Sequence, residues 1–496
     1  MPSPSPDSPR SSSFTTDVLK LVTGTTLAQI IVVLAAPFIT RLYGPEAFGL
    51  LAIFTSITSI IGVIACMRYE MAIMLPKADE EAANLLGLCL LCAAVISGLT
   101  VPALYFGGDA LLSLLRAPGL GLYLILVPPL IFISGVFLAL NYWNSRAKQF
   151  GRLSVARITC SFATTGTQLG AGFVGYATGG SLIGANLVGV SVSTGVLGGQ
   201  IWRENHVLLR RSISWRGMLD GLKRYKKFPL IDSGSALLNT ISWQLPALLL
   251  TVFFSPVVVG FYSLGFMVLQ MPMSLIGGAI AQVFFQRASE AYHQGTLTQL
   301  VENVFAVLLK LSVFPMLLLA ITGEELFLVI FGVAWGEAGI YAQILSFWAI
   351  FWFISSPLST ILSVREKLTV GFGTTILNFS TRFLSLMIGG VLGSAILSIV
   401  LFSISGVLVY GFSCFVFLRL AGVSVIGALR LITKTLTFAV PFLIPLMLAK
   451  IFAISAIMVT LLASLVLIAY SLYVFLMDPL LCNLVNGLKR KYLDKM

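Results

Sequence analysis

The sequence predicts an all-α polytopic membrane protein, with about fourteen transmembrane helices arranged as two six-helix bundles and a C-terminal pair. Two observations lead to this fold class. Of the 496 residues, 58% are hydrophobic and only 10% are charged, whereas a soluble domain carries about 25% charged residues. Apolar runs of the length that crosses a bilayer, about 20 residues, also recur along the chain from Leu19 to Met477.

The apolar runs form groups on either side of a basic segment. The N-terminal bundle, 19–202, is expected to hold spans at 19–42, 48–67, 82–106, 120–143, 153–177 and 180–202. The C-terminal bundle, 229–418, is expected to hold spans at 229–254, 257–285, 301–322, 338–364, 368–389 and 393–418. Residues 419–496 are expected to form a helix pair, at 435–450 and 454–477, and a basic tail.

Two polar segments complete this organisation. Residues 203–228, RENHVLLRRSISWRGMLDGLKRYKKF, are the most polar and basic stretch of the chain and are predicted to be a cytoplasmic linker. Residues 1–18 are rich in Pro and Ser and are predicted to be a disordered cytoplasmic tail. The thirteenth span is short and contains Pro441 and Pro445, so whether both helices of the last pair cross the membrane stays open.

The distribution of Lys and Arg orients the spans. Cytoplasmic loops carry an excess of these residues, and with both termini in the cytoplasm most of the 31 basic residues fall in cytoplasmic segments. Only Arg41, Arg116 and Lys450 then lie in outer segments, and Lys310 and Arg382 lie within spans. The net charge of +12 therefore reports topology, and we expect no nucleic-acid partner.

A short similarity relates the two bundles. Residues 44–54, GPEAFGLLAIF, follow the first span, and residues 255–266, SPVVVGFYSLGF, follow the seventh. Each places a Pro four residues before a Gly at the start of the next span. Because six spans separate the two segments, the bundles are expected to be parallel repeats, as in transporters whose halves share one orientation.

The residue types point away from enzymatic chemistry. The two histidines, His206 and His293, both lie in predicted cytoplasmic loops, and no P-loop motif is present. Cys89 and Cys92 form a CxxC pair within an apolar run, without the further ligands of a zinc site. We therefore expect a transporter with no cofactor and no bound metal.

Charges within the membrane are the most informative residues, because an ionisable group in lipid costs several kcal/mol unless it meets water, a partner or a substrate. Arg382 lies near the middle of its span, beside Asn378, Ser380 and Thr381. It is the first candidate for a cavity cation that meets an anionic substrate. The alternative is a buried arginine bound to backbone carbonyls.

Eight further polar residues are candidates for the translocation path. Lys310 lies within the ninth span and either faces a cavity or extends towards the cytoplasmic surface. Asp232 begins the seventh span, where we expect it to pair with Lys226 or Lys227. Arg41 lies at the outer end of the first span, and Arg68 and Glu70 lie at the inner end of the second. Snorkelling and a local ion pair explain these charges without function, and a gate is the alternative. The remaining candidates are amides that could bind hydroxyl groups or join helices: Gln29, Asn239 and Gln244.

Three blocks of the sequence resemble the polysaccharide biosynthesis proteins, the Wzx-type flippases of the MOP exporter superfamily. RLYGPEAFGLLAIFTSITSIIGVIACMRYEMAIMLPKADEEAANLL, from Arg41, is similar to the family's first three helices. NYWNSRAKQFGRLSVARI, from Asn141, is similar to its turn after the fourth helix. The third block, Arg224 to Ala291, is similar to its seventh and eighth helices.

The resemblance implies a multi-pass protein of the bacterial inner membrane. It would move an undecaprenyl-diphosphate-linked oligosaccharide between leaflets by alternating access, for the synthesis of O-antigen, capsule or exopolysaccharide. Its partners would be this substrate, membrane lipids, and the polymerase and export proteins of the same pathway. The sequence leaves open a peptidoglycan-precursor flippase and an ion-coupled multidrug exporter of the same superfamily.

Overall fold

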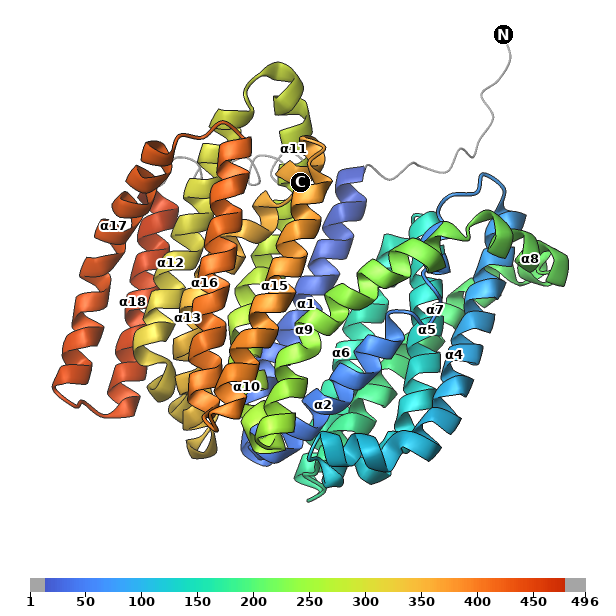
Figure 1. Cartoon of the computed structure of the whole chain (residues 1–496), viewed down its shortest axis with the longest axis horizontal. Helices are drawn as coiled ribbons and strands as arrows, with labels where there is room; N and C mark the ends of the chain where they lie inside the picture. The colour runs from blue at the N-terminus through green and yellow to red at the C-terminus, as the bar shows by residue number, and fades with distance from the viewer. Residues whose placement is uncertain (1–13, 478–496) are drawn as a thin grey trace, which may run out of the picture. The chain divides into compact units, whose positions relative to one another are not determined.

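The structure of the chain is a computed structural model (Figure 1) that describes residues 14–477, and nearly all side chains from residue 23 onward. Within this range each of the fourteen expected spans is largely helical, although the helix of the second span ends at Gly62, and no strand occurs. Eleven helices are long and apolar enough to cross a membrane, and these include α17 (Val425–Ile451) and α18 (Ala456–Met477). The predicted all-α, multi-pass membrane fold is therefore confirmed.

The helices extend beyond several predicted boundaries. The first helix, α1 (Phe14–Leu42), begins inside the predicted tail, while residues 1–13 and 478–496, the latter with the predicted basic tail, lie outside the described range. The predicted linker 203–228 is largely helical, because α7 (Gly179–Ser212) continues into it and α8 (Trp215–Arg224) follows. The polar composition of this segment favoured a linker, because a surface helix carries apolar residues on only one face.

The chain divides into two compact units, and unit 1 comprises residues up to Ala36, Ile57–Asp109 and Gly121–Thr240. It contains α3 (Tyr69–Ala72), α4 (Asp79–Leu114), α5 (Val127–Arg146), α6 (Phe150–Phe173), α7 and α8. Helices α5, α6 and α7 pack on one another. The glycine at position 189 permits the close approach of α6 and α7, since an added Cβ would lie 1.8 Å from Oγ1 of Thr164.

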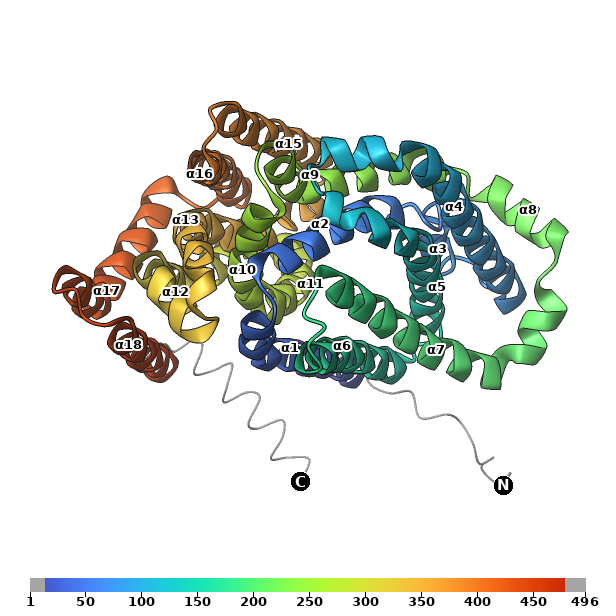
Figure 2. The same ribbon diagram turned by 90° about the horizontal axis from the view of Figure 1, so that it is seen from below.

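Unit 2 comprises Pro37–Ser56, Ala110–Leu120 and the chain from Ile241. Its helices are α10 (Pro256–Pro272), α11 (Gly278–Gln294), α12 (Leu297–Ile330), α13 (Gly336–Leu358), α14 (Ile361–Val364), α15 (Leu368–Val391) and α16 (Ala395–Leu420), with α17 and α18. The helices α2 (Pro45–Gly62) and α9 (Ser233–Phe253) contain residues of both units, as do α1 and the end of α4. Figure 2 shows α12 beside α13, α17 and α18, in agreement with their contacts.

Aromatic side chains build the centre of unit 2. The rings of Trp348 and Trp352 on α13 are stacked with their centroids 5.2 Å apart, and Phe266 of α10 stacks on both at 6.0 Å. On the other side of α12, Phe314 stacks on Tyr470 of α18 at 3.8 Å. The last helix pair is therefore packed on α12 through its own aromatic core.

The packing of α16 against Trp348 leads to a first prediction. An added Cβ at Gly406 would lie 2.1 Å from Cδ1 of Trp348, whose side chain is fully buried. Gly406→Ala should therefore lower the thermal unfolding temperature, because overpacking a close-packed site costs about 1–3 kcal/mol. Thermal denaturation of the purified protein in detergent measures this change.

Gly411→Ala on the same helix is the matched control. Its Cβ would meet Phe351 at an ordinary 3.6 Å, and alanine favours a helix over glycine by about 1 kcal/mol. Equal unfolding temperatures for the two variants would contradict the packing described for Trp348.

Candidate functional site

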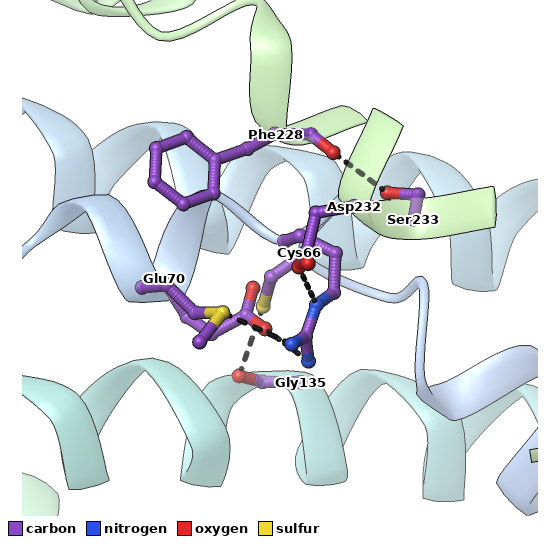
Figure 3. A network of polar contacts seen from close by, with 8 residues as sticks. Cys66, Glu70, Gly135, Phe228, Asp232 and Ser233 are labelled. Carbon is purple, nitrogen blue, oxygen red and sulfur yellow. Dashed lines mark hydrogen bonds and ion pairs between the residues drawn. The ribbon is translucent and has the colours of Figure 1, made fainter. Parts of the chain in front are cut away.

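Three charged side chains of unit 1 meet beside the short helix α3 (Figure 3). Nε of Arg68 donates a hydrogen bond of 2.7 Å to Oδ2 of Asp232, and Nη1 of Arg68 lies 3.3 Å from Oε1 of Glu70. Asp232 ends the π-helical turn η2 (Phe228–Asp232), which leads into α9. One guanidinium thus joins two carboxylates from segments far apart in the chain, and we call these three residues the Arg68 network.

The backbone positions Arg68 in the turn between α2 and α3, directly before Tyr69. Met67 and Arg68 adopt left-handed conformations, with φ angles of 51° and 62°. Such angles are unfavourable for residues with a Cβ and persist only where surrounding contacts hold them. Here the two ion pairs hold the arginine, and α3 begins immediately after it.

Glu70 is the least exposed member of the Arg68 network. Its side chain is fully buried, and Oε2 has no hydrogen-bond partner within the described residues. Between the candidate spans α2 and α4, burial raises the pKa of the Glu70 carboxyl, although its backbone N–H and the charge of Arg68 act in the opposite direction. The ionised form of Glu70 is therefore held at a cost in free energy.

The structure corrects one sequence prediction about this network. Asp232 pairs with Arg68, and not with the neighbouring Lys226 or Lys227, whose side chains are exposed. The predicted local pair between Arg68 and Glu70 is present. Arg68 is 19% exposed and Asp232 43%, so solvent-borne groups can reach their ion pair.

Arg382 lies on α15 in unit 2 and is only 3% exposed. Nη1 donates to the backbone oxygen of Ser242 at 3.1 Å, and Nη2 donates to the Tyr410 hydroxyl at 2.9 Å. Its Cζ lies 4.4 Å from the centre of the Trp243 ring, a cation–π distance. In this conformation the guanidinium is buried and binds one backbone carbonyl, as in the alternative interpretation, and it also binds a hydroxyl and an aromatic ring.

The groups that contact the Arg382 guanidinium are uncharged. Within residues 14–477 no carboxylate forms an ion pair with Arg382, so its charge is stabilised by dipoles and ring faces. Three helices, α9, α15 and α16, supply the contacts. Binding of a substrate by Arg382 remains a prediction.

The other predicted residues are dispersed. In unit 1, Gln29 on α1 is half-buried and Asn239 on α9 is exposed. In unit 2, Lys310 on α12 is half-buried, and Oε1 of Gln244 accepts a 3.1 Å hydrogen bond from Ser56, which joins α9 to α2. Arg41 is exposed and donates to the backbone oxygen of Val329 at the end of α12, at 2.9 Å.

A contact that sequence reasoning did not assign to function involves the two similar segments after the first and seventh spans. An added Cβ at Gly49 of α2 would lie 1.7 Å from the backbone oxygen of Pro256, and one at Gly260 of α10 would lie 1.9 Å from that of Pro45. The two helix starts thus touch reciprocally through their backbones, within unit 2. We call this contact the α2–α10 crossing.

Trp335 covers the α2–α10 crossing. It ends the short helix η4 (Val333–Trp335), is fully buried, and donates from Nε1 to the backbone oxygen of Thr40 at 2.8 Å. Its ring lies 4.9 Å from that of Phe48 and 6.4 Å from that of Phe261. The distribution of Lys and Arg predicts that all these segments lie on the outer side of the membrane. Their contacts with one another are consistent with that prediction.

The raised pKa of Glu70 gives a second prediction. As the pH rises through this pKa, the wild-type protein loses stability, because the ionised carboxylate is buried. Glu70→Gln keeps the shape and stays neutral. The variant should therefore unfold a few degrees above wild type at pH 8, and this advantage should shrink towards pH 4, near the usual glutamate pKa of about 4.3.

Thermal unfolding in detergent at several pH values measures this difference. An unfolding temperature of Glu70→Gln below that of wild type at pH 8 would contradict it, because attraction to Arg68 would then outweigh the cost of burial.

Comparison with solved structures identifies the fold. The chain is similar to a lipid II flippase, MurJ, in an inward closed conformation, with a TM-score of 0.71, 12% identity, and coverage of 93% of this chain and 99% of that one. It is similar to an inward-facing MATE family multidrug transporter of the MOP superfamily, with a TM-score of 0.59, 14% identity, and coverage of 82% and 99%. A MOP superfamily transporter from Pyrococcus furiosus gives a TM-score of 0.53, at 14% identity and coverage of 82% and 95%.

At these identities the likeness shows the fold alone, and it is the fold of MOP superfamily transporters. The chain matches no sequence among the curated proteins. Residues 38–340 match the family described as polysaccharide biosynthesis protein. This match covers more than half of the chain, and the protein therefore belongs to the polysaccharide biosynthesis protein family.

Proposed function

We propose that the protein is a flippase of the bacterial inner membrane, with both termini in the cytoplasm, that moves undecaprenyl-diphosphate-linked oligosaccharides to the outer leaflet. Family membership and fold similarity together support this proposal. The sequence belongs to a polysaccharide biosynthesis family, and its fold matches that of a lipid II flippase over 93% of the chain. A polysaccharide pathway that builds its units on a lipid needs this transfer step.

The Arg68 network supplies the chemistry for the diphosphate head group. A guanidinium binds phosphate oxygens through paired, charge-assisted hydrogen bonds. Nε of Arg68 donates to Asp232, whose partly exposed carboxylate can give way to a phosphate. Lys226 and Lys227, both exposed, add positive charge along the chain before this site.

The α2–α10 crossing is the closed outer end of the path in this proposal. Alternating access requires the outer side to separate after the head group has crossed. A contact made by backbone atoms and glycines closes without side-chain rearrangement. Trp335 and its aromatic neighbours then exclude water above it.

The similarity to MurJ also favours a second candidate, a flippase for peptidoglycan precursors. Both substrates carry a diphosphate, so the Arg68 network serves either. Depletion of the protein distinguishes them. Accumulation of lipid-linked repeat units on the cytoplasmic leaflet supports the first function, whereas accumulation of lipid II with arrest of wall synthesis supports the second.

Arg68→Gln gives the third prediction. Loss of the guanidinium should reduce polymer export about tenfold or more, because a hydrogen bond to a charged group contributes about 1.5–3 kcal/mol. Export is measured in cells that produce the variant in place of wild type, with protein abundance determined in parallel. Arg152→Gln is the matched control, since Arg152 of unit 1 also pairs with a partly exposed carboxylate, Glu204. Equal export by both variants would remove Arg68 from the site.

Gly49→Ala gives the fourth prediction. The added methyl group collides with the backbone oxygen of Pro256, so the α2–α10 crossing cannot close as described. Export should fall about tenfold, which corresponds to a cost of about 1.4 kcal/mol for the closed state. Gly44→Ala, where the methyl group meets nothing within 4 Å, is the control. Wild-type export by Gly49→Ala would show that the crossing does not have to close.

A further inference from the structure

We propose that α8 and the basic residues around it form a membrane-surface site for anionic phospholipids. This helix lies between two candidate spans, with α7 ending at Ser212 and the next span beginning at Phe228. The C-terminal end of α8 is therefore held within a few residues of the next candidate span. The site is independent of which substrate the protein carries.

One face of α8 is fixed on α4. Added Cβ atoms at Gly217 and Gly221 would lie 2.3 Å from Oδ1 of Asn84 and 2.9 Å from Cδ2 of Leu85, so both glycines permit close packing. The Asn84 side chain binds the turn between α7 and α8. It accepts a hydrogen bond from the backbone N–H of Ser214 and donates one to the backbone oxygen of Ser212, both at 2.8 Å. The helix therefore presents its other faces in a fixed orientation.

The second face is apolar and open. Trp215, Leu219 and Leu222 are spaced four and three residues apart, which places them on one side of the helix. They are 61%, 37% and 40% exposed. A tryptophan and two leucines at the end of a membrane span are the residues that enter the boundary between head groups and acyl chains.

The third face carries a net positive charge. Arg216 and Lys223 are exposed and form no ion pair within the described residues, although the exposed Asp220 lies between them on this face. Arg224 on this helix is bound to Glu81. Lys226 and Lys227 are also exposed, directly after α8. Each cation near an anionic leaflet strengthens binding to it. An apolar face bordered by free cations fits an anionic lipid surface, since zwitterionic lipids offer the apolar contact without the charge.

One hydrogen bond connects α8 with the Arg68 network. The Tyr69 hydroxyl donates to the backbone oxygen of Leu222 at 3.2 Å, and Tyr69 lies between Arg68 and Glu70 in the sequence. A lipid surface that holds α8 therefore also holds the segment that carries the network.

The first test measures the unfolding temperature of the full-length protein in detergent after addition of phosphatidylglycerol or phosphatidylcholine. Phosphatidylglycerol should raise it more, and high salt should reduce this difference. Arg216→Gln with Lys223→Gln should lose at least half of the difference. The matched control is Arg430→Gln with Lys434→Gln, two exposed cations four residues apart on α17, which should keep it. Equal effects of the two lipids, or equal losses in both double variants, would overturn the proposal.

The second test locates α8 in vesicles that contain phosphatidylglycerol. Spin labels are attached to Leu219→Cys and, separately, Asp220→Cys, with the unsubstituted protein as background. The label at 219 should be relaxed by oxygen and shielded from a water-soluble nickel complex, and the label at 220 should behave in the opposite way. Access of the nickel complex to both labels, or shielding of both from the two reagents as under a protein partner, would overturn the proposal.

Discussion

A buried or partly buried charge must be compensated, and this constraint governs the structure of the chain. The two units meet it differently. In unit 1 the guanidinium of Arg68 is shared between two carboxylates, of which Asp232 is partly exposed and Glu70 is buried. In unit 2 the guanidinium of Arg382 is held by a carbonyl, a hydroxyl and the face of Trp243. In our proposal the first arrangement exchanges a partner for a phosphate, whereas the second joins α9, α15 and α16 through hydrogen bonds and a cation–π contact.

Close backbone contact is the second principle of this fold. Lipid provides no hydrophobic driving force between helices, so their association depends on packing, for which small residues are favourable. The glycines at the α2–α10 crossing, at α16 beside Trp348 and at α8 beside α4 all remove a Cβ that would collide. Glycine therefore permits close packing in the core at Trp348, at the surface helix α8 and at the α2–α10 crossing, which in our proposal opens and closes.

Composition and the spacing of apolar runs were sufficient to predict the fold class and the helical segments, because the thickness of the bilayer sets one length for every span. Contacts between distant segments were not predictable. Arg68 and Glu70 are two residues apart and their pairing was expected, whereas Asp232 is 164 residues from Arg68 and was assigned to a neighbouring lysine. The depth of Arg382 could be read from its span, but its partners Ser242 and Tyr410 lie on other helices. The short similarity after the first and seventh spans contained the glycines of the α2–α10 crossing, without indicating that they touch.

The exchange of Asp232 for a diphosphate at Arg68 is the central claim, and a binding measurement on the purified protein tests it most directly. We expect Asp232→Asn to bind undecaprenyl diphosphate more tightly than wild type, because the competing carboxylate is removed. Arg68→Gln should bind it more weakly, and Arg152→Gln should bind it as wild type does. The same dissociation constant for all four proteins would contradict the account.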